Sequence, residues 1–131
     1  MLSLSKDIYL LNDDAHSNVQ TEFNHPRLHE VFAYIVEHYR KNISLDKAAA
    51  KANMTPNAFC KYFKQITRKT FMETVTDYRI NFATQQLAQT DASIASICFD
   101  SGFNDVSHFH KTFKSKMQLS PLQYRKKIMN V

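Results

Sequence analysis

The sequence predicts an all-α fold of seven helices, in which a long linker helix joins two helix-turn-helix subdomains. Three observations lead to this prediction. Apolar residues recur at the spacing of helices rather than at the alternating spacing of strands. The chain has only one glycine and three prolines, and it lacks the Asn-Gly and Asp-Gly dipeptides of β-hairpins. A helical pattern in the first half of the chain also recurs in the second half.

The composition is typical of a folded protein rather than of a disordered or membrane-spanning one. Of the 131 residues, 44% are apolar, which is enough for a core. The longest apolar runs are too short to cross a bilayer, and Asp7 interrupts any secretory signal. Cys60 and Cys98 form no C-x-x-C pair, and two free thiols fit a reducing compartment. We therefore expect a cytoplasmic protein with no cofactor, no metal site and no membrane partner.

Charge is distributed unevenly along the chain. Residues 1–24 carry a formal charge of −3, whereas residues 25–131 carry +8. We expect residues 1–24 to be a linker or the remnant of a missing N-terminal domain, and residues 25–131 to be the folded domain. A basic domain favours a polyanionic partner such as nucleic acid or an anionic membrane surface. Many ordinary domains are mildly basic too, so charge alone does not decide between these alternatives.

Three helices are predicted before the linker helix. The first runs from about Pro26, which suits a first helical turn, to about Lys41. Its expected apolar stripe is Leu28, Phe32, Ile35, Val36 and Tyr39. Ser44 is expected to cap a short helix over residues 45–52, and Thr55 to cap a third helix that runs from Pro56 to about Thr67.

Four helices are predicted in the second half of the chain. The long linker helix runs over about 70–89, starting at Thr70, and its expected apolar positions are Phe71, Val75, Tyr78, Phe82 and Leu87. Ser93 opens a helix that ends near Asp100. Asn104 is expected to cap a sixth helix ending near Lys116, and Ser120 to cap a last helix over about 120–129.

The internal repeat is the strongest sequence signal. Residues 44–56 match residues 93–105 at an offset of 49, with cap opposite cap, and the later F-x-K-x-F-K motifs match at an offset of 50. One extra residue must therefore enter the second copy near its helix start. The two turns centre on Asn53 and Gly102, the residue types that best tolerate positive φ. We interpret the repeat as two helix-turn-helix units, over about 44–67 and 93–116. The alternative interpretation is a generic αα-hairpin that was duplicated for packing only.

The second helix of each unit is predicted to present a polar face opposite an aromatic one. At 100° per residue, the third helix places aromatic and aliphatic side chains on one side: Phe59, Tyr62, Phe63 and Ile66. Its opposite side carries Asn57, Lys61, Lys64 and Arg68, with Cys60 at the margin. In the sixth helix Phe109 and Phe113 mark the buried side. Outward residues there are Ser107, Lys111 and Lys114, flanked by Val106 and His110. Such a helix can enter the major groove of DNA.

Roles in DNA recognition follow from side-chain chemistry. Lys61 and Lys111 lie centrally on the exposed faces and can donate to guanine or phosphate, whereas Asn57 can pair with adenine through two bonds. Ser107 and His110 can bond a base or a phosphate. The remaining candidates are Cys60 and Val106, which can pack on thymine methyl groups, and Lys64 and Lys114, which suit phosphate as well as bases.

Several of these residues keep a structural alternative. Val106 is equally compatible with core packing, and Cys60 with no contact at all. His108 and His110 are two residues apart and cannot share a helix face, so a metal site is not predicted there. The basic run at residues 124–127 fits either a phosphate clamp or a favourable interaction with a helix C-terminus.

The linker helix sets the predicted spacing of the two units. About eighteen residues at 1.5 Å each span roughly 27 Å, against about 34 Å for one turn of B-DNA. Two recognition helices on one chain can therefore address adjacent major grooves. Because the two copies differ in sequence, the two half-sites are expected to differ and the target need not be palindromic.

Residues from about 27 to 128 resemble the DNA-binding domain of the AraC/XylS family of transcription regulators. The resemblance is carried by four stretches: SLDKAAAKANMTPNAFCKYFK at 44–64, RINFA at 79–83, SIASICFDSGFNDVSHFHKTFK at 93–114 and SPLQYR at 120–125. Three positions depart from the family pattern. Lys61 stands where arginine is frequent, Asn53 where glycine is usual, and Val106 where glutamine is common.

The resemblance implies a seven-helix domain of the homeodomain-like, AraC type. It also implies double-stranded DNA as a partner, two-groove binding, control of transcription and contact with RNA polymerase. It implies DNA contacts at positions 57, 60, 61, 106, 107, 110 and 111. It also implies an N-terminal effector-sensing domain, which is absent from this chain, so we expect the C-terminal part of a longer regulator rather than a stand-alone one.

Two other function classes are weaker. A helical protein–protein module that docks on the transcription machinery without binding DNA is the main alternative, and the salt dependence of DNA affinity would separate the two. An enzyme is not predicted, because the sequence shows no catalytic constellation, and one glycine cannot build a phosphate loop.

Overall fold

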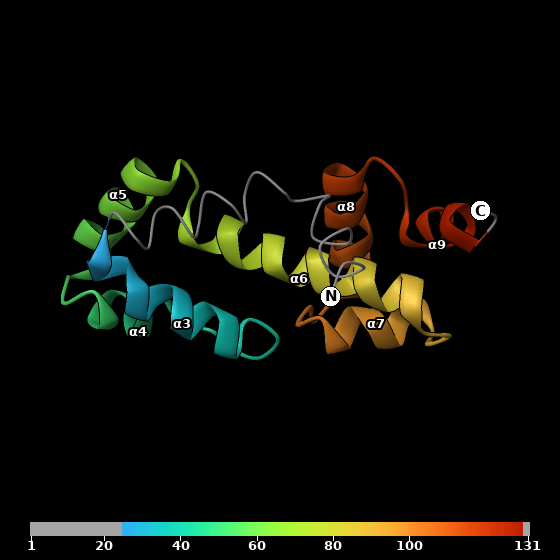
Figure 1. The fold of residues 1–131 in the computed structure, drawn as a ribbon, viewed down its shortest axis with the longest axis horizontal. Helices are drawn as coiled ribbons and strands as arrows, with labels where there is room; N and C mark the ends of the chain where they lie inside the picture. The colour runs from blue at the N-terminus through green and yellow to red at the C-terminus, as the bar shows by residue number, and fades with distance from the viewer. Residues whose placement is uncertain (1–24, 130–131) are drawn as a thin grey trace. The chain divides into compact units, whose positions relative to one another are not determined.

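The computed structural model describes residues 25–129, where the regular secondary structure consists of helices joined by short turns and connections (Figure 1). A 3₁₀ turn, η2 (Pro26–Leu28), precedes seven α-helices. These are α3 (His29–His38), α4 (Leu45–Lys51), α5 (Pro56–Thr67), α6 (Phe71–Gln89), α7 (Ile94–Asp100), α8 (Val106–Met117) and α9 (Pro121–Met129). No strand occurs within residues 25–129, so the all-α, seven-helix prediction is confirmed. The interpretation of residues 1–24 as a linker concerns residues outside the described range.

The chain divides into two compact units, one up to Tyr78 and one from Arg79 onward. The division falls inside α6, so each half of this helix belongs to a different unit. Each unit has its own hydrophobic core.

The core of the first unit is built around aromatic side chains of α3, α5 and α6. Phe32, Phe59 and Phe63 are almost completely buried. The ring centroids of Phe59 and Phe63 lie 5.8 and 5.9 Å from that of Phe71, both in edge-on geometry, the arrangement that aromatic pairs prefer. The backbone N–H of Ser44 donates to the Tyr34 hydroxyl at 2.9 Å, which ties the start of α4 to α3.

The core of the second unit repeats this construction with its own phenylalanines. Phe109 and Phe113 are fully buried, and their ring centroids lie 5.8 Å apart. Phe103 packs on Phe109 at 5.1 Å, and Tyr124 of α9 packs on Phe113 at 5.7 Å.

Arg125 fastens α9 to the carboxyl end of α6. Its guanidinium donates to three backbone carbonyls, those of Leu87 at 3.2 Å, Thr90 at 3.0 Å and Ala92 at 2.7 Å. Carbonyls at a helix C-terminus lack intrahelical partners, so this side chain satisfies those of Leu87 and Thr90 at the end of α6, while the Ala92 carbonyl lies in the connection to α7. Within the basic run at 124–127, Arg125 therefore has a structural role, while Lys126 and Lys127 are exposed.

Helix α6 does not bury one continuous stripe. The expected positions Phe71, Val75 and Leu87 are buried, but Tyr78 and Phe82 are only half-buried. Ile80 and Ala83, which lie outside the expected stripe, are completely buried in the second core. The reason is that the two halves of the helix pack in different cores, so the buried register changes along its length.

Most helix starts lie where the sequence predicts them. The side chains of Ser44, Thr55 and Ser93 accept hydrogen bonds from backbone N–H groups three residues later. Thr70 and Ser120 form reciprocal capping boxes, with Glu73 and Gln123 respectively. Asn53 and Gly102 take the positive φ expected of the two turns, 58° and 108°.

Three expectations for local structure are wrong. The first helix ends at His38 rather than near Lys41. Val36, expected in its buried stripe, is 57% exposed, because α3 buries the neighbouring Val31, Phe32 and Ile35 instead. Asn104 does not cap α8: that position belongs to Asp105, whose carboxylate accepts from the Ser107 N–H at 2.9 Å.

Candidate nucleic-acid interface

The short helices α4 and α7 lead into α5 and α8, which are the second helices of the two predicted helix-turn-helix units. α4 packs on α5 in the first unit, and α7 packs on α8 in the second. In each unit the turn closes with a backbone bond from the residue after the positive-φ position: Met54 N–H to Ala49 O at 3.0 Å, and Phe103 N–H to Cys98 O at 3.1 Å. The same local device thus fixes the entry of both second helices.

Helix α5 buries one face and exposes the other. Phe59 and Phe63 are completely buried, and Tyr62 and Ile66 pack partly against the same core. The opposite side presents an exposed row at i, i+3, i+4 and i+7, which is one face of a helix. We call this row the α5 stripe, and it consists of Asn57, Cys60, Lys61 and Lys64.

Helix α8 presents an equivalent row. Phe109 and Phe113 anchor it, with no accessible surface on either side chain. The α8 stripe has the same i, i+3, i+4, i+7 spacing and is likewise exposed, and it consists of Ser107, His110, Lys111 and Lys114. Val106, the remaining sequence-predicted site residue, is half-buried and packs against the second core. The structure therefore brings the nine candidate residues together as two rows, with Val106 at the edge of the second.

The two second helices correspond residue by residue at an offset of 50. Both have 12 residues and end at a left-handed residue, Arg68 with φ 69° and Gln118 with φ 68°. Their N-caps, Thr55 and Asp105, are also 50 apart, so Asn104 is the extra residue that the repeat predicts. It lies in the turn, outside both helices, where an insertion leaves the face of α8 unchanged.

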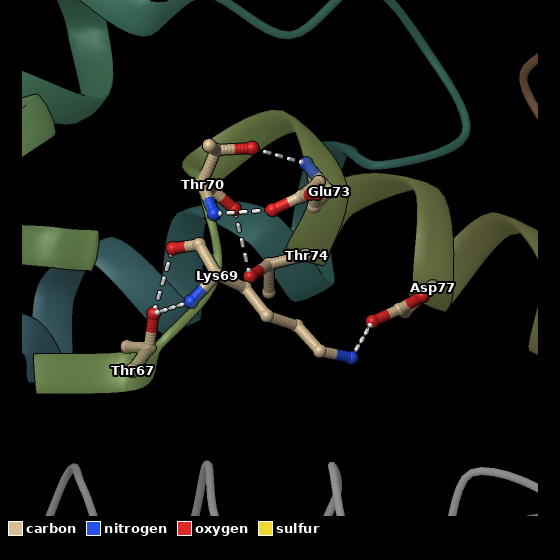
Figure 2. Close-up of polar contacts among 6 residues, drawn as sticks. All are labelled: Thr67, Lys69, Thr70, Glu73, Thr74 and Asp77. Atoms are coloured by element: carbon tan, nitrogen blue, oxygen red, sulfur yellow. Dashed lines mark hydrogen bonds and ion pairs between the residues drawn. The ribbon is translucent and has the colours of Figure 1, made fainter.

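A network of polar contacts fixes the junction between α5 and α6 (Figure 2). The Thr67 hydroxyl accepts from the Lys69 N–H at 3.2 Å and also lies 2.8 Å from the carbonyl of Phe63. The Lys69 ammonium pairs with the buried carboxylate of Asp77. Lys69 therefore has a structural role at this junction and is not one of the exposed lysines of the α5 stripe.

A shallow hollow of about 480 Å³ lies beside the α5 stripe. Its lining is formed by Cys60, Lys61, Lys64, Gln65, Thr70 and Phe71. Sequence reasoning missed this hollow, because it arises where α5 packs against the start of α6. It makes the surface next to the lysines concave, a shape that can receive a convex partner.

The two cysteines differ in environment. Cys60 is exposed on the α5 stripe, whereas Cys98 is buried in the second core. Burial, reinforced by the negative charge of Asp105, raises the pKa of the Cys98 thiol. Among residues 25–129 there is no group of three side chains suited to hold a metal ion, and no helix in that range is both long and apolar enough to cross a membrane.

Two capped, tightly turned helix pairs, each with an exposed lysine row on its second helix, define a protein of the helix-turn-helix class. A family model described as "Helix-turn-helix domain" matches residues 48–127. The chain belongs to this family, and within it to the AraC/XylS type of transcription regulator.

Individual relatives agree with this assignment. The chain is 30% identical over 100 residues to the uncharacterized HTH-type transcriptional regulator YdeC of Bacillus subtilis (strain 168), which covers 76% of this chain and 34% of YdeC. A transcriptional regulator with an AraC-type DNA-binding domain from Chromobacterium violaceum superimposes with a TM-score of 0.74 at 25% identity, covering 80% of this chain and 94% of that one.

A further solved structure is the DNA-binding domain of AdpA, a global transcriptional factor, in complex with a target DNA. It superimposes with a TM-score of 0.69 at 26% identity, covering 76% of this chain and 90% of that one. The chain spans only 34% to 39% of the length of the first curated relatives it matches.

Proposed function

We propose that this chain is the DNA-binding part of a transcription regulator and reads double-stranded DNA with α5 and α8. The observation that carries the proposal is the pair of exposed lysine stripes, each held opposite two completely buried phenylalanines. A recognition helix needs this division, because the buried side fixes it to the scaffold while the outer side meets bases and phosphates. The DNA in the AdpA complex supports the choice of partner.

Within each stripe, position and chemistry support distinct roles. Lys61 and Lys111 are central and donate to guanine or to nearby phosphates, and Lys64 and Lys114 one turn later contact phosphates. A lysine amine makes a single point contact where arginine would make two parallel bonds. Reading of individual bases therefore falls mainly to the neighbouring residues of each stripe.

Those neighbours differ between the helices. Asn57 offers both a donor and an acceptor, which suits adenine. Ser107 and His110 bond a base edge or a phosphate. Cys60, small and exposed, packs on a thymine methyl group, whereas the half-buried Val106 reaches such a methyl only with the part of its side chain that the core leaves open.

The target is proposed to consist of two unlike half-sites in successive major grooves. Nineteen residues form α6, which at about 1.5 Å per residue gives a rod of roughly 28 Å, close to one turn of DNA at about 34 Å. A single chain then does what a symmetric dimer of single helix-turn-helix domains does elsewhere.

The share of relatives that the chain covers supports a place in a longer cytoplasmic regulator. We propose that residues 1–24 lead from an effector-sensing domain, and that the bound protein contacts RNA polymerase. The proposal includes no catalytic role.

Salt titration of DNA binding tests the proposal. Selection from random duplexes should yield a bipartite motif, and affinity for it should fall about 10³-fold between 50 and 200 mM salt if about six phosphates are contacted. Replacing Lys64 and Lys114 by alanine should make this dependence shallower.

The matched control is the double substitution of Lys47 and Lys51, exposed lysines of α4, which removes the same charge away from the stripes. If selection enriched no sequence and the affinity for DNA did not change with salt concentration, the results would instead favour a protein–protein module.

A further inference from the structure

The equivalence of α5 and α8 allows their two stripes to be compared position by position. Both helices are 12 residues long and close with an N–H to carbonyl bond of 2.8 Å at a left-handed C-cap. Their anchoring phenylalanines, Phe59 with Phe109 and Phe63 with Phe113, are equally buried. Each unit therefore carries its stripe on a helix of the same length, with the same C-cap and equivalent buried phenylalanines.

Two of the four stripe positions are identical in the two helices and two are not. Lys61 matches Lys111, and Lys64 matches Lys114. The unlike pairs are Asn57 with Ser107 and Cys60 with His110. All eight side chains are exposed, so neither the like nor the unlike pairs are determined by core packing.

The chemistry of the unlike pairs separates their base preferences. An asparagine amide forms two bonds to adenine, whereas a serine hydroxyl forms one bond with little preference. A cysteine thiol is a small, weakly polar surface that suits a methyl group. An imidazole instead offers one donor and one acceptor nitrogen in its neutral form. The lysines, by contrast, are identical in the two helices and therefore have the same contact preferences at both half-sites.

The first helical position, Pro56 opposite Val106, also differs but carries no side-chain hydrogen-bonding group. Val106 is in part committed to the second core. It therefore contributes less to discrimination than the two polar pairs do.

We propose, on the basis of the proposed function, that the difference between the two half-sites is encoded by two residue pairs, 57/107 and 60/110. Exchanging these residues converts one recognition helix into a reader of the other half-site. The double variant N57S/C60H reads the second half-site in both places of the target, and S107N/H110C reads the first half-site in both.

The test is selection from random duplexes with the full chain and with both double variants, followed by affinity measurements on duplexes of the three expected types. Each double variant should prefer the duplex that carries its half-site in both places, each copy in the orientation of the half-site it replaces, over the parental target by about tenfold or more, since a well-formed base contact discriminates by about 1–3 kcal/mol. The parent should show the opposite order. Circular dichroism should be unchanged, because all four substituted side chains are exposed.

The matched control is Asp46→Ala, which also replaces an exposed residue of the first unit by its counterpart in the second unit, Ala95, but lies in α4, outside both stripes. Its selected motif should equal that of the parent.

Three results overturn the two-pair code: double variants that keep the parental motif, double variants that lose all sequence preference, and conversion that appears only after Pro56→Val is added. If the parent itself selects no motif, the proposed function fails, and that result is distinct from all three.

Discussion

Lys111 stands in the middle of the α8 stripe, one turn away from Ser107 on one side and beside Lys114 on the other. We predict that Lys111→Ala weakens specific DNA binding by about 1–3 kcal/mol, because it removes a central donor to the groove. The free energy of unfolding should stay within about 0.5 kcal/mol of the parent, since an exposed side chain is lost. Fluorescence anisotropy and urea titration measure the two quantities.

Lys116→Ala is the matched control, because this exposed lysine belongs to the same helix and lies off the stripe. Equal losses of affinity in both variants would show that α8 acts only through its overall charge.

The buried thiol of Cys98 gives stability a dependence on pH. Because burial raises its pKa in the folded state, the folded protein holds this proton more tightly than the unfolded chain does. Its contribution is therefore fully present below the unfolded pKa of about 8.5 and is lost as the pH rises above that value.

We predict that the free energy of unfolding falls with a shallower slope above about pH 8.5 in Cys98→Ala than in the parent. Urea titrations at a series of pH values provide the measurement. Ile97→Val, which alters the same core without removing a titratable group, should keep the parental slope. Identical slopes in all three proteins would exclude a role for Cys98.

At the scale of the secondary-structure element, the start of α8 depends on one carboxylate. Asp105 caps the helix, whereas Asn104 lies in the turn without a capping bond to it. We predict that Asp105→Ala lowers the free energy of unfolding by about 1 kcal/mol, and that Asn104→Ala changes it by less than about 0.5 kcal/mol. Thermal and urea unfolding measure both. The reverse order would restore Asn104 as the cap.

The capping residues show which local features can be predicted from sequence. Ser44, Thr55 and Ser93 were predicted correctly because a cap and the N–H that it accepts from are three residues apart in the same short stretch. Asn104 and Asp105 are adjacent and both suited to capping, so local preference cannot choose between them.

Structural features that depend on contacts between distant parts of the chain could not be predicted from the sequence. A single stripe was expected on α6, but two cores bury different registers of it. The partners of Arg125 lie 33 to 38 residues earlier in the chain, and no periodic pattern points to them. The exposed rows of α5 and α8 were predictable because a strict helical period determines them, whereas the DNA contacts of these rows stay predictions.

At the scale of the whole molecule, the two cores imply two centres of stability. We predict that Phe113→Ala destabilises the second unit by about 3–5 kcal/mol, because it leaves a cavity in that core. Amide hydrogen exchange should accelerate in α7, α8 and α9, while α3, α4 and α5 keep most of their protection. The parent measured under the same conditions provides the reference.

Phe63→Ala, at the equivalent position of the first unit, should give the mirror pattern. A uniform loss of protection in either variant would mean that the two cores unfold as one cooperative body.

The contacts of Arg125 affect the order in which the two units can fold during synthesis. The carbonyls at the end of α6 emerge from the ribosome more than thirty residues before the guanidinium that binds them. Until Arg125 has been synthesised, water has to hydrogen-bond these carbonyls in place of the guanidinium. The residues of the first core, by contrast, all precede residue 79 and are synthesised earlier. The second unit is completed only when α9 has been synthesised, so it closes later than the first unit can.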